Sequence, residues 1–298
     1  MRIRVLLALL AMFIVGGVMV QRWISARERL QACGFDEPQL AQLTTEADER
    51  VLFIGNSFIG NHGIDEMVRE LLLHADADSA TSFRVWGPGM TLSRHVGREG
   101  TPDGQCLRTL LSEADATVRS WDLVVLQEQS RIPTLATRLP QMRDAAATLS
   151  ERAQREGADV LLLSTWGYRD GDPDGDAHVR DFAAMTRSLD ANTREVAGSL
   201  GVDVAPAGLA FARVYEDLQR AGGDPMAPGS AFLQLYAPDG RHPSVRGSYL
   251  AACVVYAAHT GASPVGIEWA PPGVSAQARD DLQEIAAEVT LLAFQNPS

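Results

Sequence analysis

Residues 51–58 read Val-Leu-Phe-Ile-Gly-Asn-Ser-Phe, an apolar run that ends in a glycine and two polar residues. An apolar run of this length, closed by a turn residue, is typical of a strand buried on both faces of a parallel sheet. Residues 64–75 follow with apolar side chains at helical spacing, so the stretch predicts a strand, a turn and a helix. Ser57 would lie where the helix N-terminus favours an anion, a position that suits a nucleophile. Asn and Ser are also ordinary turn residues.

Outward from this segment, short apolar runs alternate with amphipathic stretches. The alternation predicts an α/β fold, a three-layer α/β/α sandwich around a mostly parallel five-stranded sheet. Two long loops, 164–177 and 222–243, would help to build a site at the C-terminal ends of the strands. Further strands are expected at residues 83–86, 123–126, 160–163 and 202–204, and further helices at 107–111, 139–155, 179–200, 206–221, 244–260 and 275–293.

A second polar motif ends the later of these loops, where residues 237–244 read Ala-Pro-Asp-Gly-Arg-His-Pro-Ser. Asp239 and His242 are three residues apart, so one turn brings the carboxylate to the Nδ1 side of the imidazole. The carboxylate would fix the tautomer of the ring and leave Nε2 to act as a base. Asp-Gly is also a common turn pair, and Asp239 could simply cap local N–H groups.

A third polar segment follows the strand expected at 123–126, where residues 127–130 read Gln-Glu-Gln-Ser. An amide directly after a buried strand can donate to a developing negative charge. Alternatively, these amides satisfy backbone groups of the loop.

The order and spacing of these segments resemble the SGNH (GDSL-type) hydrolase superfamily. In that family a serine follows the first strand in a Gly-Asp-Ser or Gly-Asn-Ser turn, as at residues 55–57. A glycine follows the second strand, as at 87–89, and Asp-x-x-His lies near the C-terminus, as at 239–242. The resemblance extends over about residues 51–259. The motifs Gly-Asn-Ser-Phe and Asp-Gly-x-His-Pro-Ser of this chain look closest to a bacterial branch of the superfamily with largely unassigned function.

The resemblance implies an SGNH/flavodoxin-like fold and a role for each matching residue. Ser57 would be the nucleophile, His242 the base and Asp239 the residue that orients it. The N–H groups of Ser57 and Gly89 would form the oxyanion hole. Such a site needs no metal or organic cofactor.

This chain departs from the family in the third block, because it has no Gly-x-Asn-Asp. Gln127 and Gln129 stand in its place. Residues two apart on a strand end face the same side, and a Gln amide donates as an Asn amide does. We expect one of the two to complete the oxyanion hole, with Gln129 ahead of Gln127.

The amino-acid composition excludes some classes of partner and some kinds of chemistry. The 298 residues carry 26 basic and 38 acidic side chains, a formal charge of −12, and every basic residue is Arg. A protein that binds the phosphate backbone needs a basic surface, so we expect no nucleic-acid partner. The absence of Lys excludes Schiff-base and P-loop lysine chemistry. Three cysteines are too few for a disulfide scaffold.

The N-terminus indicates membrane targeting. Two arginines precede an apolar run from Val5 to Val20, the pattern of a signal sequence without a clear cleavage site. We expect residues 1–24 to be an uncleaved signal-anchor, or else a cleaved signal peptide. Residues 25–49 would be a linker that ends in a short helix, and residues 50–298 the hydrolase-like domain. The domain would then lie outside the cytoplasm, on the periplasmic side.

Other polar residues have weaker support. His62 and His95 lie near the first two blocks without a partner at a suitable spacing. The acidic run 170–176, next to His178, lacks the final Glu of a calcium loop and is interrupted by a proline, so a solvated loop is expected. Trp166 could form a wall over the substrate or belong to the core.

These observations predict a serine esterase that removes an O-acyl group, an acetyl group on a carbohydrate or a cell-envelope glycan. The fold alone leaves two alternatives open. One is a glycan-binding protein without catalysis. The other is an O-acyltransferase, in which a sugar hydroxyl replaces water.

Overall fold

We describe the protein from a computed structural model. It describes residues 35–295 apart from 45, 76, 98–106, 108 and 112–119, together with residues 28, 30 and 31; of 292–295 it describes only the backbone. The chain divides into two compact units, one of residues 1–46 and 97–120 and the other of residues 47–96 and 121–298. In the first unit, helix α2 (Glu37–Thr44) buries Leu40 and Leu43. The sheet and every site residue discussed below belong to the second unit.

The second unit contains all five expected strands. They are β1 (Glu49–Gly55), β2 (Ala80–Trp86), β3 (Leu123–Leu126), β4 (Asp159–Leu163) and β5 (Asp203–Ala205). Its helices are α3 (Ser57–Gly60), α4 (Ile64–Ala75), α5 (Leu92–Gly97), α7 (Leu139–Arg155), α8 (Phe182–Leu200), α9 (Ala207–Arg220), α10 (Val245–Thr260) and α11 (Ala276–Gln295). Short 3₁₀ turns lie at Ile132–Thr134, Ala136–Arg138, Ala177–Val179 and Leu233–Leu235.

One helix begins later than the sequence predicts. We expected a helix from residue 179, but α8 begins at Phe182 because Asp181 caps it. The Asp181 side chain accepts a hydrogen bond from the N–H of Ala184, as a capping carboxylate does at a helix start. Residues 177–179 form a separate 3₁₀ turn before this cap.

The five strands form one parallel sheet in the order β2-β1-β3-β4-β5. The predicted five-stranded α/β sheet is therefore confirmed, and all of its strand pairs are parallel. The central strand β3 is buried at every position, as a strand covered on both faces must be. Near the end of β1, Ile54 lies between Val85 of β2 and Leu126 of β3.

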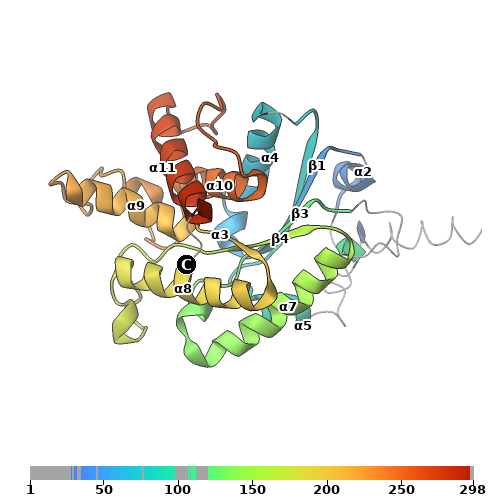
Figure 1. Ribbon diagram of the computed structural model, residues 1–298, viewed down its shortest axis with the longest axis horizontal. Helices are drawn as coiled ribbons and strands as arrows, with labels where there is room; N and C mark the ends of the chain where they lie inside the picture. The colour runs from blue at the N-terminus through green and yellow to red at the C-terminus, as the bar shows by residue number, and fades with distance from the viewer. Residues whose placement is uncertain are drawn as a thin grey trace, which may run out of the picture. The chain divides into compact units, whose positions relative to one another are not determined.

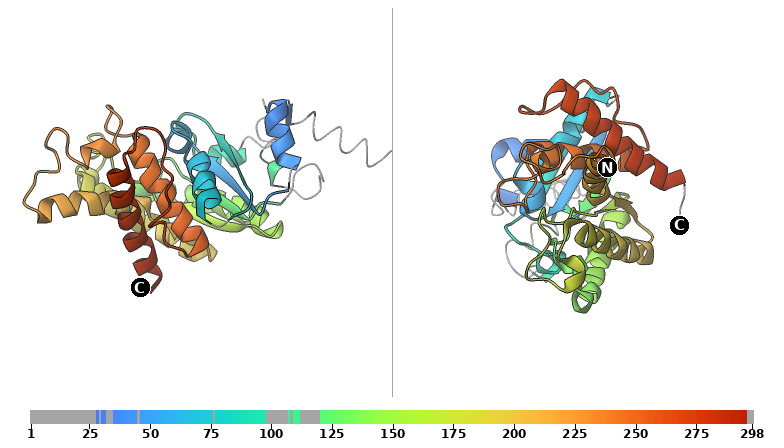
Figure 2. Two further views of the ribbon diagram at one scale, coloured as in Figure 1. Left: turned by 90° about the horizontal axis from the view of Figure 1, so that it is seen from above. Right: turned by 90° about the vertical axis from the view of Figure 1, so that its left-hand side faces the viewer.

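The strand order places the site. From β1 the chain moves to one side to form β2, and then returns past β1 to form β3, β4 and β5 in turn. Right-handed crossovers then place α4 on one face of the sheet and α7 and α8 on the other (Figure 1). Helix α10 packs beside α4, and α11 packs on α10 (Figure 2). The direction in which strands are added to the sheet reverses between β1 and β3. At such a reversal a crevice forms at the carboxyl ends of the two strands, and α/β proteins bind ligands there.

Candidate active site

The turn after β1 presents Ser57. Asn56 has an extended backbone and caps α3, because its Oδ1 accepts a hydrogen bond from the N–H of Phe58 at 3.1 Å. Ser57 is therefore the first residue of a short helix, and it is half-buried. Gly55 has no room for a side chain, since a Cβ there would lie 2.5 Å from Oε1 of Gln127. The turn thus depends on close packing against the residue that follows β3.

The structure brings the three residues of the predicted triad together. The Oγ of Ser57 lies 2.8 Å from Nε2 of His242, and Nδ1 of His242 lies 2.5 Å from Oδ2 of Asp239. The other oxygen of Asp239 accepts hydrogen bonds from the backbone N–H groups of Arg241 and His242, each at 3.0 Å. Burial raises the pKa of Asp239, but these bonds outweigh it and hold the pKa below its usual value. The carboxylate is therefore charged at neutral pH and orients Nε2 toward the serine.

Backbone hydrogen bonds fix the loop that carries His242. The N–H of Ala237 donates to the carbonyl of His242 at 2.9 Å, and the N–H of Gly240 donates to Ala237 at 3.0 Å. Gly240 has a φ of 67°, which favours glycine, and its carbonyl accepts from the N–H of Arg169 at 2.8 Å. This loop leads into α10, whose first turn is capped by Ser244.

An aromatic stack lies behind His242. Phe58 contacts His242 edge-on at 5.3 Å between ring centroids and stacks on Trp166 at 5.2 Å. Trp166 is fully buried, stacks in turn on Phe211 at 4.4 Å, and donates from Nε1 to the carbonyl of Arg241 at 3.1 Å. Of the two roles open to Trp166, the structure gives it the core one.

Two backbone N–H groups are free to form an oxyanion hole. Within the described part of the chain, neither the N–H of Ser57 nor that of Gly89 donates a hydrogen bond. Gly89 has a φ of 61° in an exposed turn that the N–H of Met90 closes on Gly87 at 3.1 Å. Among the described residues other than its two chain neighbours, no atom lies within 4 Å of the position that a Cβ on Gly89 would take.

The two glutamines of the third block lie in different environments. Gln127 is fully buried; its Oε1 accepts from the N–H of Asn56 at 3.0 Å and its Nε2 donates to the carbonyl of Glu128. Gln129 is half-buried, and its Oε1 accepts from the N–H of Arg131 at 2.9 Å. No hydrogen bond among the described residues uses the Nε2 of Gln129. Gln127 therefore supports the serine turn, and Gln129 has a free donor.

Three residues near the site were not singled out in the sequence. Asn56 donates from Nδ2 to the carbonyl of Met90 at 3.0 Å, which joins the serine turn to the Gly89 turn. Glu128 is a buried carboxyl, and Trp86 is an exposed tryptophan at the end of β2. Two signals in the sequence could have identified them. Glu128 is a charged residue directly after a buried strand, and Trp86 is an aromatic residue directly before Gly-Pro-Gly.

The remaining histidines and acidic residues stand apart from the triad. His95 is buried on α5 with its Nε2 2.8 Å from the carbonyl of Gly55, whereas His62 and His178 are exposed. In the acidic loop, Asp172 is buried and its Oδ2 lies 2.6 Å from Nε of Arg131.

Several expectations concern parts of the chain that the structure does not describe. The predicted anchor at residues 1–24 lies outside the described residues, as do Cys33 and Cys106. Cys253 is buried and free. Among the described residues, no helix is both long and apolar enough to cross a membrane. The boundaries 1–24, 25–49 and 50–298 remain predictions.

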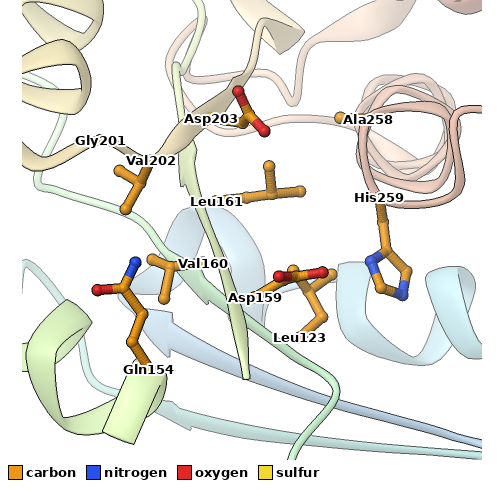
Figure 3. Close-up of a pocket in the computed structure, with 10 residues that line it drawn as sticks. All are labelled: Leu123, Gln154, Asp159, Val160, Leu161, Gly201, Val202, Asp203, Ala258 and His259. Atoms are coloured by element: carbon orange, nitrogen blue, oxygen red, sulfur yellow. The ribbon is translucent and has the colours of Figure 1, made fainter. Parts of the chain in front are cut away.

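A hollow lies at the amino edge of the sheet, at the opposite ends of the strands from Ser57. Its volume is about 160 Å³, and its walls include Leu123, Asp159 and Asp203 at the starts of β3, β4 and β5, with His259 of α10 (Figure 3). Over the residues that the structure describes, no group of three or more His, Cys, Asp or Glu side chains is placed to hold a metal ion. The candidate for catalysis is the site at the carboxyl edge, where Ser57, His242 and Asp239 are joined by hydrogen bonds.

Comparison with known proteins shows what this geometry resembles. No protein-family model and no curated protein sequence matches the chain. Among solved structures, a provisionally assigned SGNH hydrolase from Slackia heliotrinireducens is 29% identical, with a TM-score of 0.53 over 70% of this chain and 97% of the other. The predicted resemblance to the SGNH hydrolase superfamily is confirmed.

Two further solved structures align with this chain. A DUF4886 family protein from Bacteroides uniformis is 19% identical, with a TM-score of 0.62 over 84% of this chain and 95% of the other. An acetyl xylan esterase aligns at 14% identity with a TM-score of 0.48 over 70% of this chain and 98% of its own, which is too distant to bear on the substrate. The likeness to the Slackia heliotrinireducens protein supports a hydrolase of the SGNH superfamily, and the substrate must be argued from the site.

Proposed function

We propose that this protein is a serine esterase that hydrolyses an O-acyl ester, an acetyl group on a carbohydrate or cell-envelope glycan. The observation that carries the proposal is the line of hydrogen bonds from Ser57 through His242 to Asp239, at 2.8 and 2.5 Å. These distances suit a nucleophile, a base and a group that orients the base.

Each group has one task in the reaction. The Oγ of Ser57 attacks the acyl carbon while Nε2 of His242 takes its proton, and the carbonyl oxygen becomes an oxyanion that the N–H groups of Ser57 and Gly89 stabilise. The C–O bond to the alcohol then breaks, and the alcohol leaves with the proton from His242. Water attacks the acyl-serine by the same route, which releases the carboxylic acid and restores Ser57.

The sugar part of the proposal is supported by Trp86. Its side chain is 41% exposed, and a Cβ on Gly60 would lie 2.4 Å from its ring, so the indole rests directly on the backbone of α3. Gly60 is the last residue of the short helix that Ser57 begins. A flat apolar surface beside the nucleophile suits the C–H face of a sugar ring, which packs on it by dispersion.

The short acyl group is supported by the packing behind His242. Phe58, Trp166 and Phe211 stack there at centroid distances of 5.2 and 4.4 Å. Because these rings fill the space behind the imidazole, a long acyl chain could not extend in that direction. An acetyl group needs no such channel.

We place the reaction outside the cytoplasm, on the periplasmic side of a membrane in which residues 1–24 anchor the chain. The apolar run of these residues after two arginines supports this placement. We expect the full chain to sediment with membranes and a chain lacking residues 1–24 to be soluble, folded and active. A truncated protein that unfolds would assign the segment to the structure instead.

The experiment that tests the proposal is labelling with a fluorophosphonate, followed by mapping of the modified residue. We expect Ser57 to be labelled in the native protein and not in the heat-denatured protein. Ser57→Ala should abolish labelling and lower kcat for p-nitrophenyl acetate by about 10³-fold or more, with the melting temperature retained. Unchanged turnover by the folded variant would refute the nucleophile. A protein that binds glycans but reacts with neither reagent would be a binding protein, and turnover that requires a sugar acceptor would indicate an acyltransferase.

A further inference from the structure

The proposed reaction leaves one buried acid of the site without a task. Glu128 is 4% exposed and follows β3 directly. Its Oε1 accepts hydrogen bonds from the N–H of Gln129 at 2.6 Å and from the N–H of Leu92 at 3.2 Å. Its Oε2 is buried and has no hydrogen-bond partner within the described residues. A buried carboxyl with an unused oxygen costs stability, so its presence calls for a physical reason.

The contact with Leu92 links Glu128 to the oxyanion hole. Leu92 begins α5, two residues after the turn of residues 87–90 that carries Gly89. On the other side of the same turn, the carbonyl of Met90 accepts from Nδ2 of Asn56 at 3.0 Å. The turn is therefore held by Asn56 at Met90 and by Glu128 at Leu92.

Gln127 closes this arrangement into a ring. Its Oε1 accepts from the N–H of Asn56, and its Nε2 donates to the carbonyl of Glu128. Side-chain and backbone hydrogen bonds thus join the three segments that follow β1, β2 and β3. The residues that replace the third block of the family are the part of the ring contributed by β3.

The other described residues give the tip of this turn little support. Gly89 is exposed, and apart from its two chain neighbours no described residue has an atom within 4 Å of its Cβ position. A donor of an oxyanion hole must nevertheless be held in place, since a shift of about 1 Å in a catalytic group can lower the rate about 10²-fold. The electrostatics agree with this role, because burial raises the pKa of Glu128 to about 7. In the neutral acid, Oε1 still accepts both N–H groups and no charge is buried.

We propose that Glu128 is a positioning residue that holds the Gly87–Met90 turn through Leu92 and so fixes the Gly89 N–H in the oxyanion hole. The inference rests on the proposed function, because an oxyanion hole has a task only if Ser57 attacks an ester. Glu128 touches no reacting atom and acts through the turn alone.

The test compares Glu128→Ala with Glu128→Gln. The amide keeps an oxygen that can accept from Leu92 and Gln129, whereas alanine removes the acceptor. For p-nitrophenyl acetate we expect Glu128→Ala to lower kcat by about 10- to 100-fold with KM within about threefold, and Glu128→Gln to stay within about threefold of the parent kcat. The rate of fluorophosphonate labelling at Ser57 should follow kcat. Leu189→Ala, a core truncation on α8, is the control for lost stability, and it should keep the parent kcat while it remains folded.

Four outcomes would overturn the inference. Glu128→Ala with the parent kcat would show that the turn needs no such support, and Glu128→Gln as slow as Glu128→Ala would show that an acceptor is not what matters. If Glu128→Ala fails to fold, Glu128→Asp makes the same comparison, because its shorter side chain withdraws from Leu92; parent kcat in that variant would also refute the role. A parent protein that neither turns over the ester nor reacts with the probe would refute the proposed function and this inference together. Loss of the effect in the variants alone refutes only the inference.

Discussion

Two carboxyl groups of this site have opposite environments. Asp239 has a side chain that is 47% exposed, accepts hydrogen bonds from His242 and two backbone N–H groups, and has a lowered pKa. Glu128 is almost completely buried and has a raised pKa. The first is suited to stabilise a positive charge that forms on His242, and the second to hold the scaffold as a neutral acid below about pH 7. The environment, more than the chemical group, separates the two roles.

The same division recurs in two other pairs of like residues. Gln129 is half-buried and its Nε2 donates to no described residue, whereas both amide atoms of the buried Gln127 form hydrogen bonds. Trp86 is 41% exposed, whereas Trp166 is fully buried in an aromatic stack. In each pair we expect the more exposed member to affect turnover and the more buried one to affect stability.

The largest expected effect is at Asp239. In Asp239→Asn, the amide N–H would face Nδ1 of His242 and favour the wrong tautomer, with a proton on Nε2. We expect kcat for p-nitrophenyl acetate to fall by about 10³- to 10⁴-fold. The melting temperature should change little, because Asp239 is exposed. Asp170→Asn is the control, since Asp170 is an exposed aspartate that pairs with Arg169 and does not contact His242. A folded Asp239→Asn protein with a tenth or more of the parent kcat would remove Asp239 from the mechanism.

The glutamine pair gives the next largest effect. Gln129→Ala should lower kcat by about 10²- to 10³-fold at nearly constant stability, as the loss of an oxyanion donor does. Gln127→Ala should instead lower the free energy of unfolding by about 1–3 kcal/mol, because it leaves the buried N–H of Asn56 unpaired. Gln129→Glu is a matched control that keeps an acceptor for the N–H of Arg131 but has no donor, so it should be as slow as Gln129→Ala. If both alanine variants retain full kcat, the hole consists of the two backbone N–H groups alone.

Because Glu128 is buried, we expect it to make the free energy of unfolding depend on pH. Its pKa is raised from an ordinary 4.5 to about 7, so between these values the folded protein keeps a proton that the unfolded chain has lost. Stability therefore falls as pH rises through this window, by about 3 kcal/mol for this group. Glu128→Gln does not titrate, so from pH 5 to pH 8 it should gain stability relative to the parent by about this amount.

Denaturant unfolding at the two pH values measures this difference, and Leu189→Ala should show a constant offset from the parent. A constant offset for Glu128→Gln as well would mean that Glu128 is already charged in the folded protein at pH 5. Asp239 has the opposite sign, since a lowered pKa contributes stability that is lost as pH falls through the acid range.

The fold and the contacts that join Ser57, His242 and Asp239 were predictable because their signals are local. The run at residues 51–55 and the Asp-x-x-His spacing identify a buried strand and a paired imidazole, and the strand order then brings them to one edge. The roles of Gln127 and Glu128 were not predictable, because they depend on contacts with Asn56 and Leu92 that lie 71 and 36 residues away. The pattern of apolar and polar residues within one segment does not predict contacts between segments so far apart in the sequence.

The tryptophan pair gives the smallest effect and tests the substrate. Trp86→Ala should raise KM for an acetylated oligosaccharide about tenfold, equivalent to ~1.4 kcal/mol of binding, and leave KM for ethyl acetate unchanged because that alcohol has no ring to stack. Gly60→Ala offers an independent route, because its Cβ would lie 2.4 Å from the indole and displace the ring without removing it. Trp166→Phe is the control; it loses the hydrogen bond to Arg241 and should lower the melting temperature while the ratio of the two KM values stays at the parent value. If Trp86→Ala and Gly60→Ala both leave the oligosaccharide KM unchanged, the exposed indole does not hold the sugar and the glycan part of the proposed function falls, while the esterase itself stands.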